Sequence, residues 1–560
     1  MNKRIWIGLS AATLCTAFFC SSNFGREKWP QQSATQKAAA EETNKLEDQE
    51  EADLQPQLTE WAAKGKPFIP WAAKPSDLPQ AGIPAFPGAQ GGGMYSFGGR
   101  GGKVIVVSSL EDSGPGTLRE ACKTAGPRIV VFNVAGIIHL QRRIEVIAPY
   151  ISIEGQSAPG DGVCVAGDTL EINTHDAVIR YMRFRRGNMD VYNRNDGLGG
   201  DPVGNILVDH ASCSWGFDEN LSMYRHMYVL PDKSHQYKLP TVNITLQWNI
   251  SSEALDTYNH AFGGTWGGRN DVFHHNLFAC DTGRNCSMGL GGDFNYINNV
   301  VFNWRHRTID GGDDTSRVNI INNYFKPGPI TPDAPIRYRI VKPDAKRGKG
   351  IAKQYGIFYV IGNIVSDNPM VTADNWAGGV QLGEGSDDAD AATQSASYKP
   401  PVSQATPEMI KEIKSDHSFP LAPVTIQPTL EAYDSVLAGA GATLPRRDPV
   451  DQRVVQEVQT GVVTYGKGIL TNIDQVGGYP KYEGAPYTGS QAVDGIPDWW
   501  KTKYGLKLDD PSVATQDNAG DGYTNIEKFL GGMDPTKKYD LNVLANNVNT
   551  LTPDQLQPLK

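Results

Sequence analysis

The segment from Asp271 to Tyr324, DVFHHNLFACDTGRNCSMGLGGDFNYINNVVFNWRHRTIDGGDDTSRVNIINNY, repeats one pattern, a short apolar run that ends at asparagine. The pattern continues on both sides, and QWNI, HHNL, INNV, INNY and IGNI place it at Asn249, Asn276, Asn299, Asn323 and Asn363. The intervals are 27, 23, 24 and 40 residues. A period in the twenties with one insertion is typical of a solenoid.

Asparagine suits the corner of a coil because its side chain can bond to the backbone and because it tolerates left-handed angles. Successive coils can therefore stack asparagine on asparagine. The runs between the asparagines alternate apolar and polar residues, as strands do, and helix-like sequence is scarce there. The sequence predicts an all-β chain folded as a parallel β-helix, with peripheral loops and helices. A β-sandwich, which has no fixed period, is the alternative.

The composition agrees with a large protein of strands and turns. The chain has 560 residues, 39% of them hydrophobic, and it contains 60 glycines and 36 prolines, which helix interiors tolerate poorly. The formal net charge of -10 argues against nucleic acid as a partner, but it permits an acidic ligand in a local basic groove. We expect a monomer.

The N-terminus has the pattern of an export signal. Lys3 and Arg4 precede an apolar run, Ile5 to Phe19, that is too short to span a bilayer. Residues 1–20 therefore predict a secreted, periplasmic or cell-surface protein, and Cys20 adds the alternative of a lipid anchor to the outer membrane. Residues 21–80 are rich in Gln, Glu, Ala and Lys and predict a disordered tether.

The remaining chain divides into a predicted β-helix domain with a C-terminal cover, residues 81–485, and a small tail module, residues 490–560. In the tail, DNAGDGYTNIE places Asp517, Asp521, Asn525 and Glu527 around Gly522, with a spacing close to that of an EF-hand loop. The loop resembles short calcium-binding repeats at the ends of secreted bacterial enzymes. We expect structural Ca²⁺ there; a simple Asp-Gly turn before an amphipathic helix is the alternative.

Several ordered blocks resemble a known family. VDHASCSWGFDENLS (residues 208–222), TLQWNISSEAL and HHNLFACDTGRN follow one another, and GTLREA lies near the front. Together they resemble the pectate lyases of polysaccharide lyase family one, over about Pro84 to Tyr482. The resemblance implies a right-handed parallel β-helix and β-elimination of polygalacturonate, or a related uronan, assisted by calcium.

Such a lyase needs a cation to neutralise the C6 carboxylate of the sugar, a base for the C5 proton, and a groove for an acidic chain. Calcium bound by carboxylates acts as a Lewis acid that makes the C5 proton more acidic. By the resemblance, Asp196 and Asp218 fall on calcium ligands of the family. Arg194 and Ser222 stand where the family has two further acidic ligands, so we expect a weaker or rearranged site.

Glu219 or Asp201 are candidates to complete that calcium site, or the substrate brings the ion. Arg284 falls on the family's catalytic arginine, which is taken to remove the C5 proton. Arginine is an awkward base because its guanidinium stays protonated in nearly all proteins; a site with other cations around it, and an alkaline optimum, would ease this difficulty. A structural clamp on backbone carbonyls at a corner of the solenoid, or a salt bridge across coils, is the alternative role for Arg284.

Substrate-binding candidates are fewer than the family pattern implies. Gly289 replaces a second family arginine, and no lysine matches the family's substrate-binding lysine near HAFGG. We expect His260 to contribute there, Arg305 or Arg307 to supply the lost cation, and Trp266 to stack on a sugar face, with a place in the core as the equal alternative for Trp266. Two other functions remain open at this stage: a glycoside hydrolase on the same scaffold, which needs a pair of positioned carboxylates, and a noncatalytic polysaccharide-binding β-helix.

Overall fold

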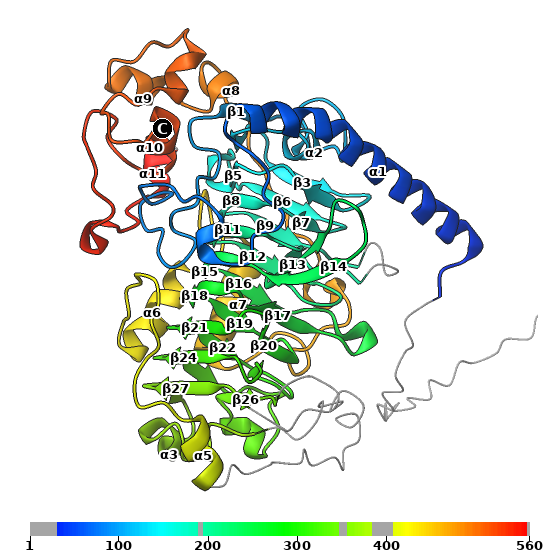
Figure 1. Ribbon diagram of the computed structural model, residues 1–560, viewed down its shortest axis with the longest axis vertical. Helices are drawn as coiled ribbons and strands as arrows, with labels where there is room; N and C mark the ends of the chain where they lie inside the picture. The colour runs from blue at the N-terminus through cyan, green and yellow to red at the C-terminus, as the bar shows by residue number, and fades with distance from the viewer. Residues whose placement is uncertain (1–30, 189–193, 346–354, 383–406, 557–560) are drawn as a thin grey trace, which may run out of the picture.

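The computed structural model describes residues 31–188, 194–345, 355–382 and 407–556. The predicted export signal, with Cys20, lies outside the described residues. Within them, parallel strands stack coil upon coil into a β-helix, as the asparagine repeat predicted (Figure 1). No described helix is long and apolar enough to span a bilayer.

Three parallel walls enclose the core of the described β-helix. The first wall is one sheet of β1 (Lys103–Val107), β2 (Arg128–Phe132), β5 (Ile151–Glu154), β8 (His175–Arg180), β11 (Gly204–Asp209), β15 (Val242–Gln247), β18 (Arg269–His274), β21 (Asp293–Ile297), β24 (Arg317–Ile321) and β27 (Ile357–Ile361). The second wall is one sheet of β3 (Gly136–His139), β6 (Val163–Ala166), β9 (Arg183–Arg185), β12 (Ser212–Ser214), β16 (Ile250–Ser252), β19 (Leu277–Ala279), β22 (Val300–Phe302), β25 (Tyr324–Lys326) and β28 (Ile364–Val365).

The third wall is interrupted, and the interruption lies beside the candidate site. Its first part consists of β4 (Ile144–Val146), β7 (Leu170–Ile172) and β10 (Leu198–Gly199), and its second part of β17 (Phe262–Trp266), β20 (Gly283–Met288), β23 (Ile309–Gly311) and β26 (Val341–Pro343). Single bridges, from Leu198 to Leu221 and from Glu219 to Phe262, connect the two parts. After this interrupted coil an antiparallel hairpin, β13 (Arg225–Val229) and β14 (Gln236–Pro240), projects outward.

The predicted asparagine stack is confirmed. The side-chain amide of each of Asn249, Asn276, Asn299 and Asn323 donates to the Oδ1 of the next member, at 3.0, 2.9, 3.2 and 2.8 Å. Asn363 continues the ladder by donating to Asn375 Oδ1 at 3.0 Å. The residue before each of the five has a left-handed backbone, with φ between 54° and 68°. The ladder thus forms one sharp corner of every coil from β15 to β28.

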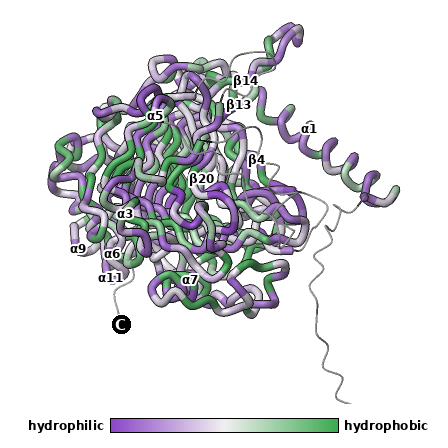
Figure 2. The backbone as a smooth tube through the Cα atoms, turned by 90° about the horizontal axis from the view of Figure 1, so that it is seen from below, coloured by the Kyte–Doolittle hydropathy of each residue, from purple (hydrophilic) through white to green (hydrophobic). Residues whose placement is uncertain are grey.

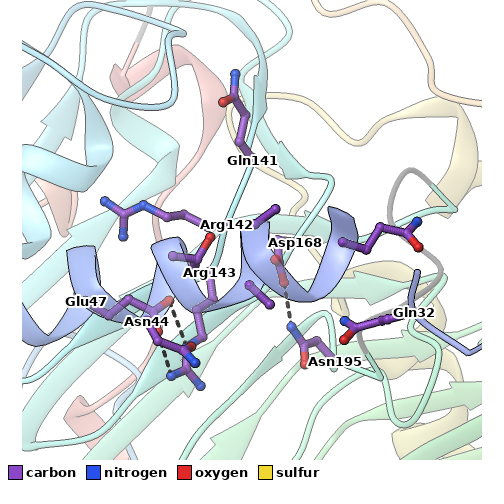
Figure 3. A pocket seen from close by; sticks show the side chains of 12 residues that line it. Gln32, Asn44, Glu47, Gln141, Arg142, Arg143, Asp168 and Asn195 are labelled. Carbon is purple, nitrogen blue, oxygen red and sulfur yellow. Dashed lines mark hydrogen bonds and ion pairs between the residues drawn. The ribbon is translucent and has the colours of Figure 1, made fainter. Parts of the chain in front are cut away.

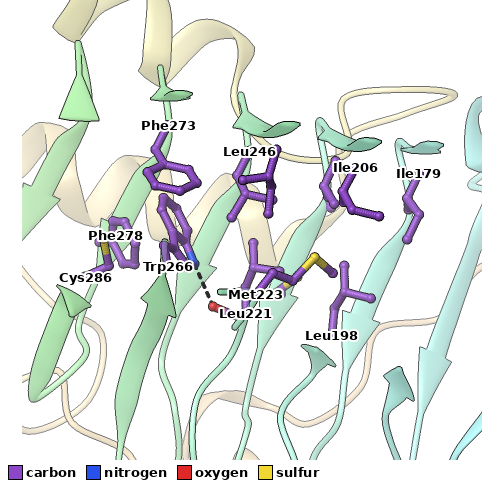
Figure 4. Packing of buried hydrophobic residues seen from close by; sticks show 14 of the residues in the cluster. Ile179, Leu198, Ile206, Leu221, Met223, Leu246, Trp266, Phe273, Phe278 and Cys286 are labelled. Atoms are coloured by element: carbon purple, nitrogen blue, oxygen red, sulfur yellow. Dashed lines mark hydrogen bonds between the residues drawn. The ribbon is translucent and has the colours of Figure 1, made fainter. Parts of the chain in front are cut away.

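Apolar side chains from all three walls fill the interior. Figure 4 shows Trp266 between Phe273 and Phe278, with Leu221 and Leu246 from the preceding coil nearby. Trp266 is fully buried, and its indole N–H donates to the Leu221 carbonyl at 2.7 Å. The prediction that Trp266 stacks on a sugar is therefore wrong, because this ring belongs to the core.

Helices cover the outside of the walls and ends: α2 (Leu118–Cys122), α3 (Pro369–Ala373), α5 (Pro407–Ile413), α6 (Thr429–Gly439) and α7 (Pro449–Thr460). The C-terminal cover predicted within residues 81–485 includes α6 and α7. Val436 of α6 and Val454 of α7 pack on apolar residues of the second wall. Buried ion pairs join Arg185 of β9 to Asp448 and Asp451 at 2.8 Å, which fixes α7 to the β-helix.

The C-terminal tail does not stand apart from the β-helix. Its short helices are α8 (Gln491–Asp494), α9 (Asp498–Lys503), α10 (Asn525–Leu530) and α11 (Pro553–Leu556). Trp500, Ile526 and Phe529 form one buried cluster with Ile129 and Val131 of β2. The tail therefore covers the first wall at its N-terminal end.

The acidic residues of the predicted calcium loop in the tail contact the protein's own donors. Asp517 accepts the backbone N–H groups of Gly520 and Gly522, both at 2.8 Å. Asp521 pairs with Lys528 at 3.0 Å, and Glu527 pairs with Arg100 at 2.7 Å.

Asn525, the remaining predicted ligand, is fully buried and donates to the Val513 carbonyl at 2.8 Å. The Asn525 Oδ1 atom is buried and has no hydrogen-bond partner among the described residues. The loop forms a turn that caps α10, and calcium binding there stays a prediction.

The predicted disordered tether is corrected, because α1 (Ala34–Ala63) occupies half of it. Ser33 caps the helix through its side chain. Leu54 and Leu58 are buried against Ala125 and Ala148 of the β-helix, whereas the preceding turns extend along the outside of the body (Figures 1 and 2). Composition alone missed the helix because its apolar contact is confined to its last turns.

Candidate active site

An outer groove runs along the third wall at its interruption. It consists of two adjoining cavities of about 470 and 410 Å³, which share Tyr224, Thr265 and Arg284 in their linings. Asp196, Asp218 and Glu219 also line the first cavity. The structure thus brings the predicted catalytic arginine and both predicted calcium ligands into one groove.

Arg284 reaches the groove because the coils stack in register. Glu219 is bridged to Phe262, and Phe262 pairs with Gly283, the residue before Arg284. The guanidinium of Arg284 lies over the Phe262 ring, 4.4 Å from its centroid, and its Nη1 contacts Glu219 Oε1. Asp218 Oδ1 lies 4.0 Å from the same nitrogen.

The charge state of Arg284 follows from these neighbours. Burial alone would lower the pKa of Arg284, but the carboxylates of Glu219 and Asp218 outweigh this effect and raise it. In the substrate-free protein the guanidinium is therefore a firmly protonated cation. It is placed to attract an anionic group, and it must lose both the Glu219 contact and a proton before it can act as a base.

Asp196 is a carboxyl group that forms no ion pair with a described cation. Its Oδ1 accepts the backbone N–H of Glu219 at 3.1 Å. Burial in the groove, and then the charges of Glu219 and Asp218, raise the pKa of Asp196 well above its ordinary value. Burial and the Asp218 charge likewise raise the pKa of Glu219. This part of the groove favours a bound cation.

Asp218 is held ionised by basic groups. Burial acts to raise its pKa, but the close contact with His260 and the charges of Arg194 and Arg284 lower it overall. His260 Nδ1 lies 2.5 Å from Asp218 Oδ1, and its ring packs on Phe262. In the substrate-free structure, His260 thus contacts a predicted calcium ligand, and whether it also contacts substrate stays a prediction.

The other two predicted cations separate in space. Arg307 lines the second cavity with Arg284, where it pairs with Asp310 at 3.1 Å and lies over the Phe262 ring. Arg305 pairs with Asp256 at 2.7 Å and lines neither cavity. Of the two, Arg307 has the position expected of a substrate-binding cation.

The hairpin brings groove residues that the sequence analysis missed. Tyr224, next to β13, lines both cavities, and the exposed Lys238 of β14 lines the second, with its ammonium 5.3 Å from the Tyr224 ring centroid. Arg225 donates to the Tyr224 hydroxyl at 2.8 Å and pairs with Asp201. Lys238 supplies a cation and Tyr224 supplies a half-exposed ring. The sequence analysis had predicted these two features at Arg305 or Arg307 and at Trp266. The exposed KSHQYK segment carried no signal of its own, since only the hairpin turns it back to the groove.

The fit to calcium depends on few carboxylates. Within the described ranges, no group of three or more His, Cys, Asp and Glu side chains is arranged to hold a metal ion. Asp196, Glu219 and Asp218 nevertheless bring carboxylate oxygens, the donors that calcium prefers, to one part of the groove. Calcium binding by these residues stays a prediction.

Comparison with known proteins gives the family. Probable pectate lyase C of Aspergillus flavus is 31% identical over 467 residues, which is 81% of this chain and 94% of the relative. The protein of the same name from Aspergillus fumigatus is 33% identical over 462 residues, with the same shares. No model of a protein family matches the chain.

Solved structures resemble the chain loosely. A pectate lyase bound to a hexasaccharide is 12% identical, with a TM-score of 0.40 over 65% of this chain and 99% of that one. The cedar pollen allergen Jun a 1 is 16% identical, with a TM-score of 0.37 over 58% and 92%. The assignment rests on the sequence relatives, by which this chain belongs to the pectate lyases, a family of polysaccharide lyases.

Proposed function

We propose that this lyase cleaves polygalacturonate, or a closely related uronan, by calcium-assisted β-elimination with Arg284 as the proton acceptor. One observation carries the proposal: the Arg284 guanidinium lies in an open groove beside two carboxylates that pair with it or with His260, and beside a third, Asp196, that no described cation pairs with. The groove thus offers a cation for a uronate and surplus carboxylate oxygens for a metal ion.

In the proposed reaction, the C6 carboxylate of the sugar draws the Arg284 guanidinium away from Glu219. Arg284 first gives up one proton to hydroxide, which alkaline solution supplies, and becomes a neutral base. Arg284 then accepts the C5 proton, the C5–H electron pair forms the C4=C5 double bond, and the C4–O4 bond breaks. The leaving O4 takes a proton from water. The products are a 4,5-unsaturated uronate at one new end and a free hydroxyl at the other.

Asp196, Asp218 and Glu219 would hold the calcium ion, which when bound offsets their charge and withdraws electrons from the substrate carboxylate. His260 keeps Asp218 in place for this role. Lys238, Arg307 and the Tyr224 ring are proposed to bind flanking sugars, since acidic chains need cations and pyranose faces pack on aromatic rings. Because the chain belongs to the pectate lyases, neither the glycoside hydrolase nor the noncatalytic binding protein is favoured.

The test is a product assay on polygalacturonate, with and without a calcium chelator. The proposal expects ultraviolet absorbance from unsaturated ends to rise together with new reducing ends, and to stop with the chelator until calcium is restored. New reducing ends without that absorbance would indicate hydrolysis. Full activity with chelator present would remove calcium from the mechanism.

A further inference from the structure

Helix α1 presents one stripe of residues to the β-helix, and this stripe changes character along its length. Towards the C-terminus the stripe is apolar, with Leu54 and Leu58 buried and Trp61 packed beside them. Towards the N-terminus it contains Glu47 and Glu50, and no residue between 31 and 50 is buried. The first half of α1 is thus held by polar contacts alone.

Those contacts are ion pairs to two arginines next to the third wall (Figure 3). Arg143 donates to both carboxylate oxygens of Glu47, at 3.2 Å from Nε and 2.9 Å from Nη2. Arg142 binds Glu50 in the same two-pronged manner, with one contact at 2.8 Å, and Lys123 also contacts Glu50. This fork geometry is how arginine recognises any carboxylate, including that of a uronic acid.

The two arginines lie on the line of the groove. A cavity of about 500 Å³ between α1 and the β-helix is lined by Arg142, Arg143 and Asn195. Arg143 and Asn195 also line the cavity that contains Arg284. On the side facing that cavity, Arg143 pairs with Glu145 at 3.2 Å and Glu171 at 3.4 Å, which orient its guanidinium.

We propose that Arg142 and Arg143 form a distal subsite for uronate carboxylates, which Glu47 and Glu50 of α1 fill until a long substrate chain displaces them. The inference rests on the proposed function, because it takes an acidic polysaccharide to be the ligand of the groove. It assigns α1 the role of a carboxylate-bearing strap over one end of the groove. Leu54, Leu58 and Trp61 keep the strap attached when its first half is displaced.

Only a long chain can reach this subsite from Arg284. Five strand steps separate β4, next to Arg143, from β20, through β7, β10, Leu221 and β17. At about 4.8 Å for each step, the backbones at Arg143 and Arg284 are roughly 24 Å apart. This separation is more than a trisaccharide bound at Arg284 covers. The kinetics on trigalacturonate therefore depend on the catalytic centre alone, whereas the kinetics on polygalacturonate depend on both the centre and the strap.

The test compares the full chain with its Glu47→Gln/Glu50→Gln double variant on both substrates. The amide side chains remove the competing charge, so we expect a KM for polygalacturonate that is lower by about two- to ten-fold, since each of these half-buried surface ion pairs shifts an equilibrium by about a few-fold. We expect kcat on both substrates and KM for trigalacturonate to stay the same. Glu60→Gln, which removes an exposed Glu60–Lys64 pair on the same helix, is the matched control.

Adding Arg142→Gln and Arg143→Gln to the double variant should abolish the gain. An unchanged polygalacturonate KM in the double variant, or a gain that survives loss of both arginines, would overturn the subsite. Hydrogen exchange of the unaltered chain gives a second readout: polygalacturonate, but not trigalacturonate, should speed exchange in residues 36–50, and equal exchange would overturn the strap. Failure of the proposed function looks different, because then no variant releases unsaturated product from either substrate.

Discussion

Replacing Asn299 by alanine tests the ladder that sets the corner of the coils. The Asn299 side chain accepts from the backbone N–H and the side-chain amide of Asn276, both at 2.9 Å, and donates to the Phe273 carbonyl at 2.9 Å and to Asn323 at 3.2 Å. Alanine leaves the Asn276 N–H and the Phe273 carbonyl without these partners in a buried corner. At about 1–3 kcal/mol for each buried unsatisfied group, the expected loss is roughly 2–6 kcal/mol in the free energy of unfolding.

Guanidinium unfolding followed by circular dichroism measures this loss as a lower midpoint. Asn44→Ala, at an exposed asparagine on α1, is the control for the substitution itself. Because Asn276 and Asn299 share hydrogen bonds, their double alanine variant should lose less than the sum of the single losses. An Asn299→Ala variant as stable as the Asn44→Ala control would refute the claim that the ladder holds the coils in register.

Three further predictions concern the groove and the core. The raised pKa of Asp196 means that its ionisation opposes folding, so Asp196→Asn should be more stable than the parent chain. The margin should grow as pH rises above about 4, the pKa of an aspartate in the unfolded chain. Thermal melts at several pH values check this, with Asp48→Asn as control, and an equal shift in both variants would contradict it. Lys238→Ala should raise KM for polygalacturonate several-fold with little change in kcat or melting temperature, whereas Lys233→Ala, at the hairpin tip, should not; steady-state kinetics distinguish them. Trp266→Ala should lower stability by about 3–5 kcal/mol, as expected for an emptied core position; an unchanged unfolding midpoint with weaker substrate binding would restore its predicted role in stacking.

Much of the fold was predictable because it repeats. The five asparagines are each flanked by short apolar runs. Each one marks a corner that needs two local features, a left-handed residue and then a side chain that bonds to the next coil. The structure shows both features. Helix α1 was missed because the stripe it buries is apolar only from Leu54 onward. For the C-terminal loop the spacing of acidic residues could not show which cations pair with them: Lys528 follows the loop directly, whereas Arg100 comes from a remote part of the chain.

The site was predictable where residues lie on stacked coils and not where a hairpin supplies them. Arg284, Asp218 and Asp196 come together because successive coils pair in register, so that equivalent positions lie above one another. Tyr224 and Lys238 reach the groove through the pairing of β13 with β14, a contact that no repeat period encodes. Trp266 was misassigned because the side-chain alternation along an interrupted wall cannot be counted from sequence alone.

The most direct test of the account is the turnover of Arg284→Lys on polygalacturonate with calcium present, measured by the absorbance of unsaturated ends and paired with calorimetric binding of an oligogalacturonate. Lysine keeps a positive charge but loses the planar fork of donors. The account predicts turnover lower by at least about 100-fold, the smallest effect typical of a lost proton-transfer group, with oligosaccharide affinity changed only a few-fold and with Arg317→Lys unaffected. Turnover that persists in Arg284→Lys at the level of the parent chain would contradict the assignment of Arg284 as the group that takes the C5 proton.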